Sequence, residues 1–220
     1  MNLSLTLLST RHSDERVNQA LWEALQKLHT LRDFQVILVN DLFAAWEVPA
    51  VDFPLECLNT AGMGQYQAIL QGLTRCRSDI VIIFDPDYAA ILDVLVDQLL
   101  SACALGFDWV LLRRLQRPGV AASRRWLSNS YNQLLRWMCA LGVHDINSPV
   151  MALTATALRQ LPDLPQGEVK LHLYDRLSGR VTEIAADAPQ SPGRSSYSLW
   201  NLLPVLVARV LAVLQYFYYR

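Results

Sequence analysis

Hydrophobic and polar positions along the chain follow two alternating patterns. Four short apolar runs have the length of buried strands: Leu3–Ser9, Gln35–Asp41, Asp79–Phe84 and Asp108–Arg114. Other segments carry apolar residues every three or four positions, as amphipathic helices do: Glu15–Thr30, Gly64–Cys76 and Ile91–Gly106. Strands that alternate with helices predict parallel βαβ units, so the expected fold class is α/β, with a mostly parallel sheet flanked by helices.

The alternation weakens after Arg114. The pattern then predicts a long helix over Ser123–Gly142 and a short helix over Met151–Leu161. Two later segments, Glu168–Asp175 and Gly179–Ala186, fit either a pair of strands or a helix followed by a strand. The pattern leaves both alternatives open.

The last part of the chain differs in composition from the rest. We expect one domain over residues 1–190, followed over residues 191–220 by a polar linker and an apolar helix. The segment Leu199–Tyr219 is long enough to approach a bilayer-spanning helix, but it contains Pro204 and a central Arg209. An arginine at the bilayer centre costs about 3 kcal/mol on insertion scales. We therefore favour a helix that lies on the membrane or docks on a partner, with a helix packed on the domain core as the alternative.

The composition indicates contact with a membrane or a large protein interface. Of the 220 residues, 52% are hydrophobic and 18% are charged, whereas an ordinary soluble domain has roughly 25% charged residues. The net charge of -1 gives no reason to expect nucleic acid as a partner. The four cysteines are widely spaced and form no CxxC pair, which indicates reduced thiols in a protein that faces the cytosol.

Two aspartates follow the third apolar run, in the stretch Phe84-Asp85-Pro86-Asp87. Ligands of open α/β sheets bind beyond the carboxyl ends of the strands, and residues i and i+2 of an extended segment point the same way. Two carboxylates on one side suit a hard divalent cation that also carries phosphate oxygens. Asp85 and Asp87 are therefore candidate ligands of Mg²⁺ or Mn²⁺, and a solvated Asp-Pro turn is the alternative.

A basic stretch lies between Asp108 and Asp145, where no acidic residue occurs. It contains the arginines Arg113, Arg114, Arg117, Arg124, Arg125 and Arg136. The guanidinium fork binds phosphate oxygens in pairs, so this stretch is a candidate phosphate site, although a solvated helix face also explains it. Carboxylates for a metal and arginines for phosphate, in one α/β domain, suit the stabilisation of a nucleoside diphosphate leaving group.

Five stretches follow one another along the chain: Gly64–Gly72 (GQYQAILQG), Asp85–Ala89 (DPDYA), Arg124–Leu134 (RRWLSNSYNQL), Asp145–Val150 (DINSPV) and Gly193–Leu199 (GRSSYSL). Each has a counterpart, in the same order, in the family-2 glycosyltransferases. The chain resembles in particular the polyprenyl-phosphate sugar transferases, the group of dolichol-phosphate mannose synthase. This resemblance implies a GT-A (nucleotide-diphospho-sugar transferase) fold. It also implies transfer of a sugar from a nucleotide-sugar donor to a polyprenyl-phosphate acceptor at the cytoplasmic face of the membrane.

The resemblance implies a donor site with five named residues. Asp85 and Asp87 are expected to act in catalysis by holding the metal and the donor diphosphate. Ser9, Asp41 and Gln65 are expected to bind the nucleotide sugar together with Asp85. His12 follows the first strand, where a donor phosphate would lie, but a loop histidine without a binding role is the interpretation we favour from the sequence.

The resemblance also implies an acceptor site in the second half of the chain. Arg124 and Ser128 are expected to hold the lipid phosphate, with help from Arg114, and Asp145 is expected to take part in catalysis. The expected partners are the donor, the lipid acceptor and the membrane surface, with a second copy of the chain or a membrane protein as a further possibility.

Several positions depart from the family's motifs. Ser9–Ser13 has no acidic residue where the family has one, so that acid is either missing or displaced to Asp14. The glycine and serine of the next loop are absent from Asn40–Glu47, and Ala89 replaces a glutamine. A second hypothesis is therefore a non-catalytic GT-A relative that binds a lipid phosphate or a partner enzyme. A third is a soluble sugar transferase whose acceptor is not a lipid.

Overall fold

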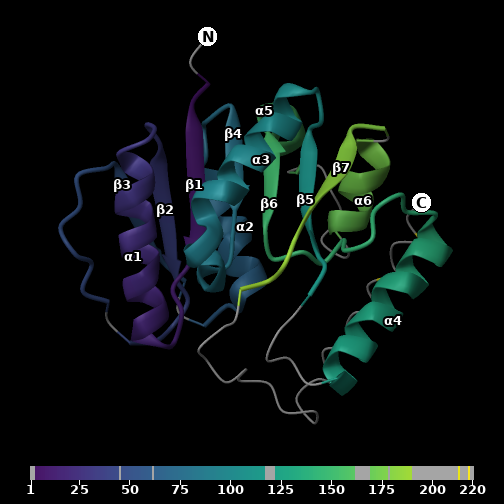
Figure 1. Ribbon diagram of the computed structural model, residues 1–220, viewed down its shortest axis with the longest axis horizontal. Helices are drawn as coiled ribbons and strands as arrows, with labels where there is room; N and C mark the ends of the chain where they lie inside the picture. The colour runs from purple at the N-terminus through teal and green to yellow at the C-terminus, as the bar shows by residue number, and fades with distance from the viewer. Residues whose placement is uncertain are drawn as a thin grey trace.

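The computed structural model describes residues 3–44, 46–60, 62–116, 122–161, 169–177, 179–189, 213 and 218, without the side chains of 123, 124, 127, 138 and 139. Its strands form one seven-stranded sheet in the order β3-β2-β1-β4-β6-β5-β7 (Figure 1). The strands are β1 Leu5–Thr10, β2 Gln35–Asn40, β3 Leu55–Asn59, β4 Ile80–Ile83, β5 Trp109–Arg114, β6 Met151–Thr154 and β7 Val181–Ala186. Only β6 runs antiparallel to its neighbours, β4 and β5, so the prediction of a mostly parallel sheet is confirmed.

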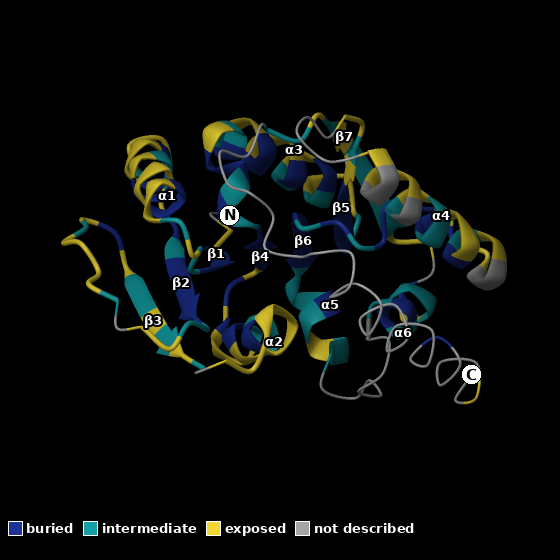
Figure 2. Ribbon diagram, turned by 90° about the horizontal axis from the view of Figure 1, so that it is seen from below, coloured by how far each residue is buried: buried dark blue, intermediate teal, exposed yellow. Residues whose placement is uncertain are grey.

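Helices cover both faces of the sheet. They are α1 Glu15–His29, α2 Gln65–Arg75, the 3-10 helix η1 Pro86–Ile91, α3 Leu92–Ala104, α4 Ala122–Cys139, α5 Ala155–Gln160 and α6 Val169–Arg176. Figure 2 shows α1 and α3 on one side of the sheet, and α2, α5 and α6 on the other. The central strands are therefore buried on both faces, which explains why they appear in the sequence as nearly continuous apolar runs.

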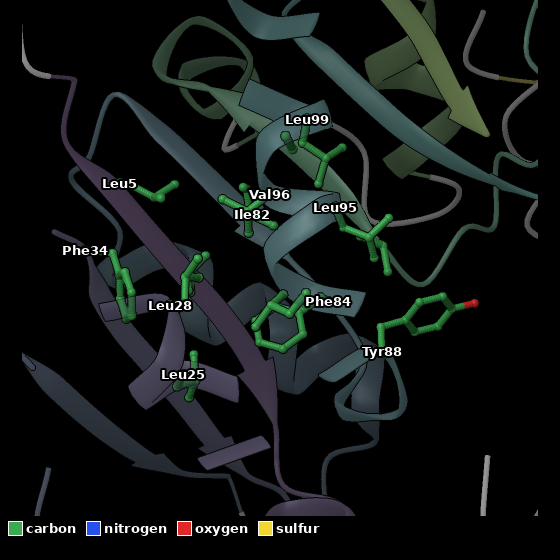
Figure 3. Close-up of a cluster of buried hydrophobic side chains, with 14 of the residues drawn as sticks. Leu5, Leu25, Leu28, Phe34, Ile82, Phe84, Tyr88, Leu95, Val96 and Leu99 are labelled. Carbon is green, nitrogen blue, oxygen red and sulfur yellow. The ribbon is translucent and has the colours of Figure 1, made fainter. Parts of the chain in front are cut away.

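Each face of the sheet has its own hydrophobic core, because successive strand residues point to opposite sides. On β1, Leu7 belongs to the core under α1 and α3, whereas Leu8 belongs to the core under α2. Figure 3 shows the first core, where Phe84 lies among leucines of α1 and α3. Gly72 of α2 comes so close to the sheet that a Cβ there would lie 2.4 Å from Leu8 Cδ1, so a larger residue at this position would push the buried Leu8 side chain aside.

The structure corrects one predicted element and decides another. The predicted helix over Met151–Leu161 is wrong in its first part, because Met151–Thr154 forms β6 and the helix α5 begins only at Ala155. Thr154 ends the strand and caps the helix, with its side chain accepting from Ala157 N. For the two later segments that the pattern left open, the structure shows the helix α6 over Val169–Arg176 and the strand β7 over Val181–Ala186.

The predicted C-terminal helix lies outside the described residues, apart from Val213 and Tyr218. Both are helical; Val213 is buried with the core under α2, and Tyr218 is 84% exposed. The linker from residue 190 onward is likewise outside the described part. Within the described ranges, no helix has both the length and the apolar character that crossing a membrane requires.

Candidate functional site

The candidate site lies where the order of the strands reverses. The chain passes from β1 to β2 on one side, and β4 pairs with β1 on the other, which creates the crevice where ligands of α/β sheets bind. The loops after β1 and after β4 therefore adjoin. Two hydrogen bonds hold the strands together at this point, from Phe84 N to Leu8 O at 3.0 Å and from Ser9 Oγ to Phe84 O at 2.8 Å.

Asp85 and Asp87 lie at this crevice, as the sequence predicts. Asp85 caps η1, with its Oδ1 accepting from Asp87 N at 3.1 Å, and Pro86 occupies the first position of η1, where a missing N–H costs nothing. The proline between the two aspartates is thus part of a helix start. Burial raises the pKa of the Asp85 carboxyl, and the charge of Asp87 adds to the rise although the Asp87 N–H opposes it.

Gln65 joins Asp85 from the other side of the crevice. It is the first residue of α2, and its Nε2 lies 3.4 Å from Asp85 Oδ2. Asp41 shapes the loop before α2: its carboxylate accepts from Thr60 Oγ1 at 2.7 Å, and from Met63 N and Gly64 N at 2.8 Å each. The structure therefore gives Asp41 a role in placing α2, and with it Gln65.

Ser9 is 1% exposed, and its hydroxyl donates to the Phe84 carbonyl that directly precedes Asp85. Of the predicted donor-site residues, the structure thus brings Gln65, Asp85 and Asp87 to one crevice. Ser9 is buried and bonds the backbone before Asp85, and Asp41 bonds the loop before Gln65.

The acceptor half centres on a buried ion pair between Arg114 and Asp145. Arg114 Nε donates to Asp145 Oδ2 at 2.6 Å and Nη2 to Oδ1 at 2.9 Å, and Asn132 Nδ2 adds a bond to Oδ1 at 3.0 Å. Burial alone would lower the pKa of Arg114, but the hydrogen bonds and charge of Asp145 outweigh it, and the charge of Asp85 adds to the net rise. The guanidinium therefore lies within the electrostatic reach of both carboxylates.

Arg124 and Ser128 lie four residues apart near the start of α4, so they share one side of that helix. The side chain of Arg124 is outside the described part, and Ser128 is half-buried. The structure confirms that both belong to one helix, whereas their contact with a phosphate remains a prediction.

Sequence reasoning missed Glu183 of β7, which organises the turn before β6. Its Oε1 accepts from His144 N at 2.7 Å and from Asp145 N at 2.6 Å, and its Oε2 lies 2.9 Å from His144 Nδ1. The available signal was a lone carboxylate inside a strand that otherwise carries only apolar residues and Thr182. Such a residue needs buried donors, but the sequence does not say which ones.

A cavity of about 220 Å³ lies beside Gln65 and Asp85 and is also lined by the chain that follows Asp145. Its walls are mostly apolar and come from α2, the sheet and α6, and its polar lining residues are Gln65, Asp85, Asn147, Ser148 and Lys170. Lys170, also missed from the sequence, donates to the carbonyl oxygens of Ile146 at 3.2 Å and Ser148 at 3.4 Å. Three of the motif stretches, far apart in the chain, therefore line one cavity.

The described residues contain no cluster of three or more histidine, cysteine, aspartate or glutamate side chains arranged around a metal position. Asp85 and Asp87 are hard oxygen donors, and the charge of each is unfavourable to the other. A divalent cation would relieve this repulsion, so the pair fits Mg²⁺ or Mn²⁺ if water and substrate oxygens supply the other ligands.

No family model matches the chain. The structure has the fold of nucleotide-sugar glycosyltransferases of the GT-A type. It matches glucosyl-3-phosphoglycerate synthase from Mycobacterium tuberculosis in complex with phosphoglyceric acid, with a TM-score of 0.66 and 15% identity over 97% of this chain and 80% of that one. The form of that enzyme with Mn²⁺, UDP and glucosyl-3-phosphoglycerate gives a TM-score of 0.67 at 15% identity, over the same shares of the two chains. At this identity the likeness shows the fold.

Sequence comparison points to a narrower group, the undecaprenyl-phosphate 4-deoxy-4-formamido-L-arabinose transferases. The chain is 27% identical over 145 residues to the Pseudomonas fluorescens SBW25 protein, covering 65% of this chain and 42% of that protein. It is 25% identical over 189 residues to the Pseudomonas savastanoi pv. phaseolicola protein, covering 81% and 55%. The chain thus spans about half the length of these relatives. The resemblance to polyprenyl-phosphate sugar transferases, predicted from the motifs, is confirmed at low identity.

Proposed function

We propose that this protein transfers a sugar from a nucleotide-sugar donor to a polyprenyl-phosphate acceptor. The observation that carries the proposal is the shared cavity, because it brings Gln65 and Asp85 of the donor half together with Asn147 and Ser148, which belong to the motif stretch Asp145–Val150. The sequence similarity to transferases that are named for an undecaprenyl-phosphate acceptor supports the choice of acceptor. The fold supports the choice of donor.

In this proposal, an oxygen of the lipid phosphate attacks the anomeric carbon of the sugar, and the bond from that carbon to the nucleoside diphosphate breaks. The phosphate is already anionic near neutral pH, so positioning matters more than proton removal by a strong base. Asp85 and Asp87 would hold a Mg²⁺ or Mn²⁺ ion, which when bound would supply positive charge to the leaving diphosphate. Gln65 positions Asp85 from the start of α2.

Arg114 supplies fixed positive charge between the two half-sites, and Asp145 acts through it. Asp145 is 3% exposed, and its carboxylate accepts hydrogen bonds from Nε and Nη2 of the Arg114 guanidinium. Asp145 therefore orients Arg114, while Arg124 and Ser128 on α4 hold the acceptor phosphate. Preorganised charge of this kind costs no rearrangement during the reaction.

We place the reaction at the cytoplasmic face of the membrane, with α4 as the contacting element. Figure 1 shows α4 extending away from the sheet. Trp126 is 70% exposed, Trp137 is 82% exposed and Leu134 is 46% exposed. Tryptophan and leucine on one side of a helix that also carries arginines suit the interface of a bilayer with anionic lipids. The apolar C-terminal segment would add an anchor or a contact with a partner.

The test combines binding with turnover. Calorimetric titration with UDP, GDP and CDP in the presence of Mn²⁺ should show binding of at least one nucleotide, and Asp85→Asn should abolish it. Asp97→Asn is a matched control, because Asp97 pairs with Arg32 on the exposed side of α3, away from the crevice. Transfer of labelled sugar to undecaprenyl phosphate should then depend on Arg124, and Arg124→Ala should raise the acceptor KM.

A second candidate function is a non-catalytic relative that binds a lipid phosphate or a partner enzyme. The lack of a third metal-ligating side chain beside Asp85 and Asp87 in the described residues favours it. It predicts membrane or partner association that survives Asp85→Asn and Asp87→Asn but falls with Arg124→Ala. Sugar transfer at an ordinary enzymatic rate would exclude it.

A further inference from the structure

His12 stands on the opposite wall of the crevice from the two aspartates. It follows β1, while Asp85 and Asp87 follow β4, and these two strands are neighbours in the sheet. The distance from His12 Nε2 to Asp87 Oδ1 is 4.0 Å, and both side chains are partly exposed, at 27% and 30%. His12 is therefore accessible to a ligand that Asp85 and Asp87 hold.

The position of His12 is fixed by hydrogen bonds on three of its atoms. Its backbone N–H donates to Asn18 Oδ1 at 2.9 Å, and its carbonyl oxygen accepts from Asn18 Nδ2 at 2.9 Å. Asn18 is itself 1% exposed, on the inner side of α1. The ring nitrogen Nδ1 accepts from Asp14 N at 2.9 Å. Backbone and ring are thus both held before any ligand arrives.

The bond from Asp14 decides which ring nitrogen carries the proton. A backbone N–H can only donate, so Nδ1 must present its lone pair, and the proton of the neutral imidazole is on Nε2. At 4.0 Å, Asp87 Oδ1 is too far from Nε2 for a hydrogen bond. Within the described residues, the Nε2–H has no hydrogen-bond acceptor, and a carboxylate oxygen of Asp87 lies near it.

The same tautomer argues against His12 as a metal ligand. Coordination through Nε2 requires its lone pair, whereas here Nε2 carries the proton and Nδ1 is occupied by the Asp14 N–H. The ring is instead a hydrogen-bond donor near the carboxylates of Asp85 and Asp87, which can only accept hydrogen bonds. The Nε2–H therefore suits an anionic oxygen of a ligand that also binds a cation held by Asp85 and Asp87.

We propose that His12 binds a phosphate oxygen of the nucleoside diphosphate through its Nε2–H. This inference rests on the proposed function, because it takes the donor to be a nucleotide sugar. The same diphosphate would contact the cation, and the His12 imidazole would add a neutral hydrogen-bond donor from the β1 side of the crevice. A hydrogen bond to a charged group contributes about 1.5–3 kcal/mol, so its loss weakens binding about 10-fold or more.

Two variants separate the role of Nε2 from the role of Nδ1. In His12→Asn, the side-chain oxygen replaces Nδ1 as acceptor for Asp14 N, but the side chain is too short to donate at the position of Nε2. In His12→Gln, the amide reaches the position of Nε2 and donates there, while the acceptor for Asp14 N is lost. Each variant thus loses the hydrogen bond of one ring nitrogen and keeps that of the other.

The experiment is calorimetric titration of the full chain with UDP, GDP and CDP in Mn²⁺, alongside thermal unfolding and ¹⁵N NMR of His12 without ligand. We expect the Nε2–H tautomer, a loss of nucleotide affinity of about 10-fold or more in His12→Asn with little change in Tm, and the reverse pattern in His12→Gln. Unchanged affinity in His12→Asn, or a proton on Nδ1, overturns the proposal and leaves the proposed function standing. Absence of nucleotide binding in the unaltered protein overturns both.

Discussion

Arg114 and Asp145 meet edge to edge through two parallel hydrogen bonds, although 31 residues separate them in the chain. Their side chains are 17% and 4% exposed. Removal of one partner from such a buried pair strongly destabilises the fold, because the remaining charge stays buried without its partner. The pair is therefore the point where the acceptor half is most sensitive to substitution.

Asp145→Asn should lower the free energy of unfolding by about 3–5 kcal/mol, because it leaves the Arg114 guanidinium without a counter-charge. Urea denaturation measures the change. The control is Lys27→Met, which breaks the exposed pair with Asp93 at 68% and 31% exposure and should cost about 1 kcal/mol or less. Equal losses in the two variants would contradict the assignment of Arg114 and Asp145 as a structural centre.

Asp85→Asn should make the metal-free protein more stable at neutral pH while it abolishes nucleotide binding. Burial raises the pKa of Asp85 in the folded protein, so the folded state binds more protons than the unfolded state, and stability falls as pH rises from about 3.9 through the raised value. Asparagine caps η1 equally well and does not ionise. Thermal unfolding in EDTA should show a gain at pH 7 that shrinks toward pH 4.

The control for this gain is Asp97→Asn, whose carboxylate is 66% exposed and should show no such gain. A lower Tm for Asp85→Asn than for the unaltered protein at pH 7 would mean that the ionised carboxylate stabilises the fold. Asp85 would then serve to stabilise the turn, and its ionised carboxylate would not be a destabilising group that awaits a cation.

Glu183→Ala should loosen the turn before β6. Two backbone N–H groups, those of His144 and Asp145, lose their acceptor, and each unsatisfied buried donor costs about 1–3 kcal/mol. Hydrogen exchange of these two amides should accelerate, and the acceptor KM should rise as Asp145 and Arg114 shift. Glu183→Gln keeps one acceptor oxygen and should retain most of the protection; equal exchange in both variants would argue against this role.

Joint replacement of Trp126 and Trp137 by alanine should weaken binding to vesicles that contain anionic lipids. Each exposed ring can bury enough apolar surface for about 1.5 kcal/mol or more, which corresponds to about 10-fold in affinity for each ring. Sedimentation with vesicles measures the partition. Leu105→Ala is the control, since Leu105 is 80% exposed at the end of α3, and a similar loss there would contradict the use of α4 as the membrane contact.

The central strands could be predicted because burial on both faces leaves a continuous apolar run, as at Ile80–Ile83. The same argument fails for β3, which is only half-buried, and for Met151–Thr154, where pairing with β4 and β5 overrides a composition that suits a helix. Asp85 and Asp87 could be predicted because their chemistry is local to one strand end. The partners of Asp145 could not, because Arg114 and Glu183 reach it only through the folded sheet.

The antiparallel strand β6 sets the distance between the two parts of the crevice. Met151 pairs with Ile83 on one side and with Leu111 on the other, so the segment that carries Asp145 enters the sheet beside the strand ends that carry Asp85 and Arg114. A shift of β6 by two residues would preserve which face each side chain occupies, yet it would displace this segment by about 7 Å. The backbone pairing of β6 thus fixes the distance between the donor and acceptor residues, independently of which side chains occupy those positions.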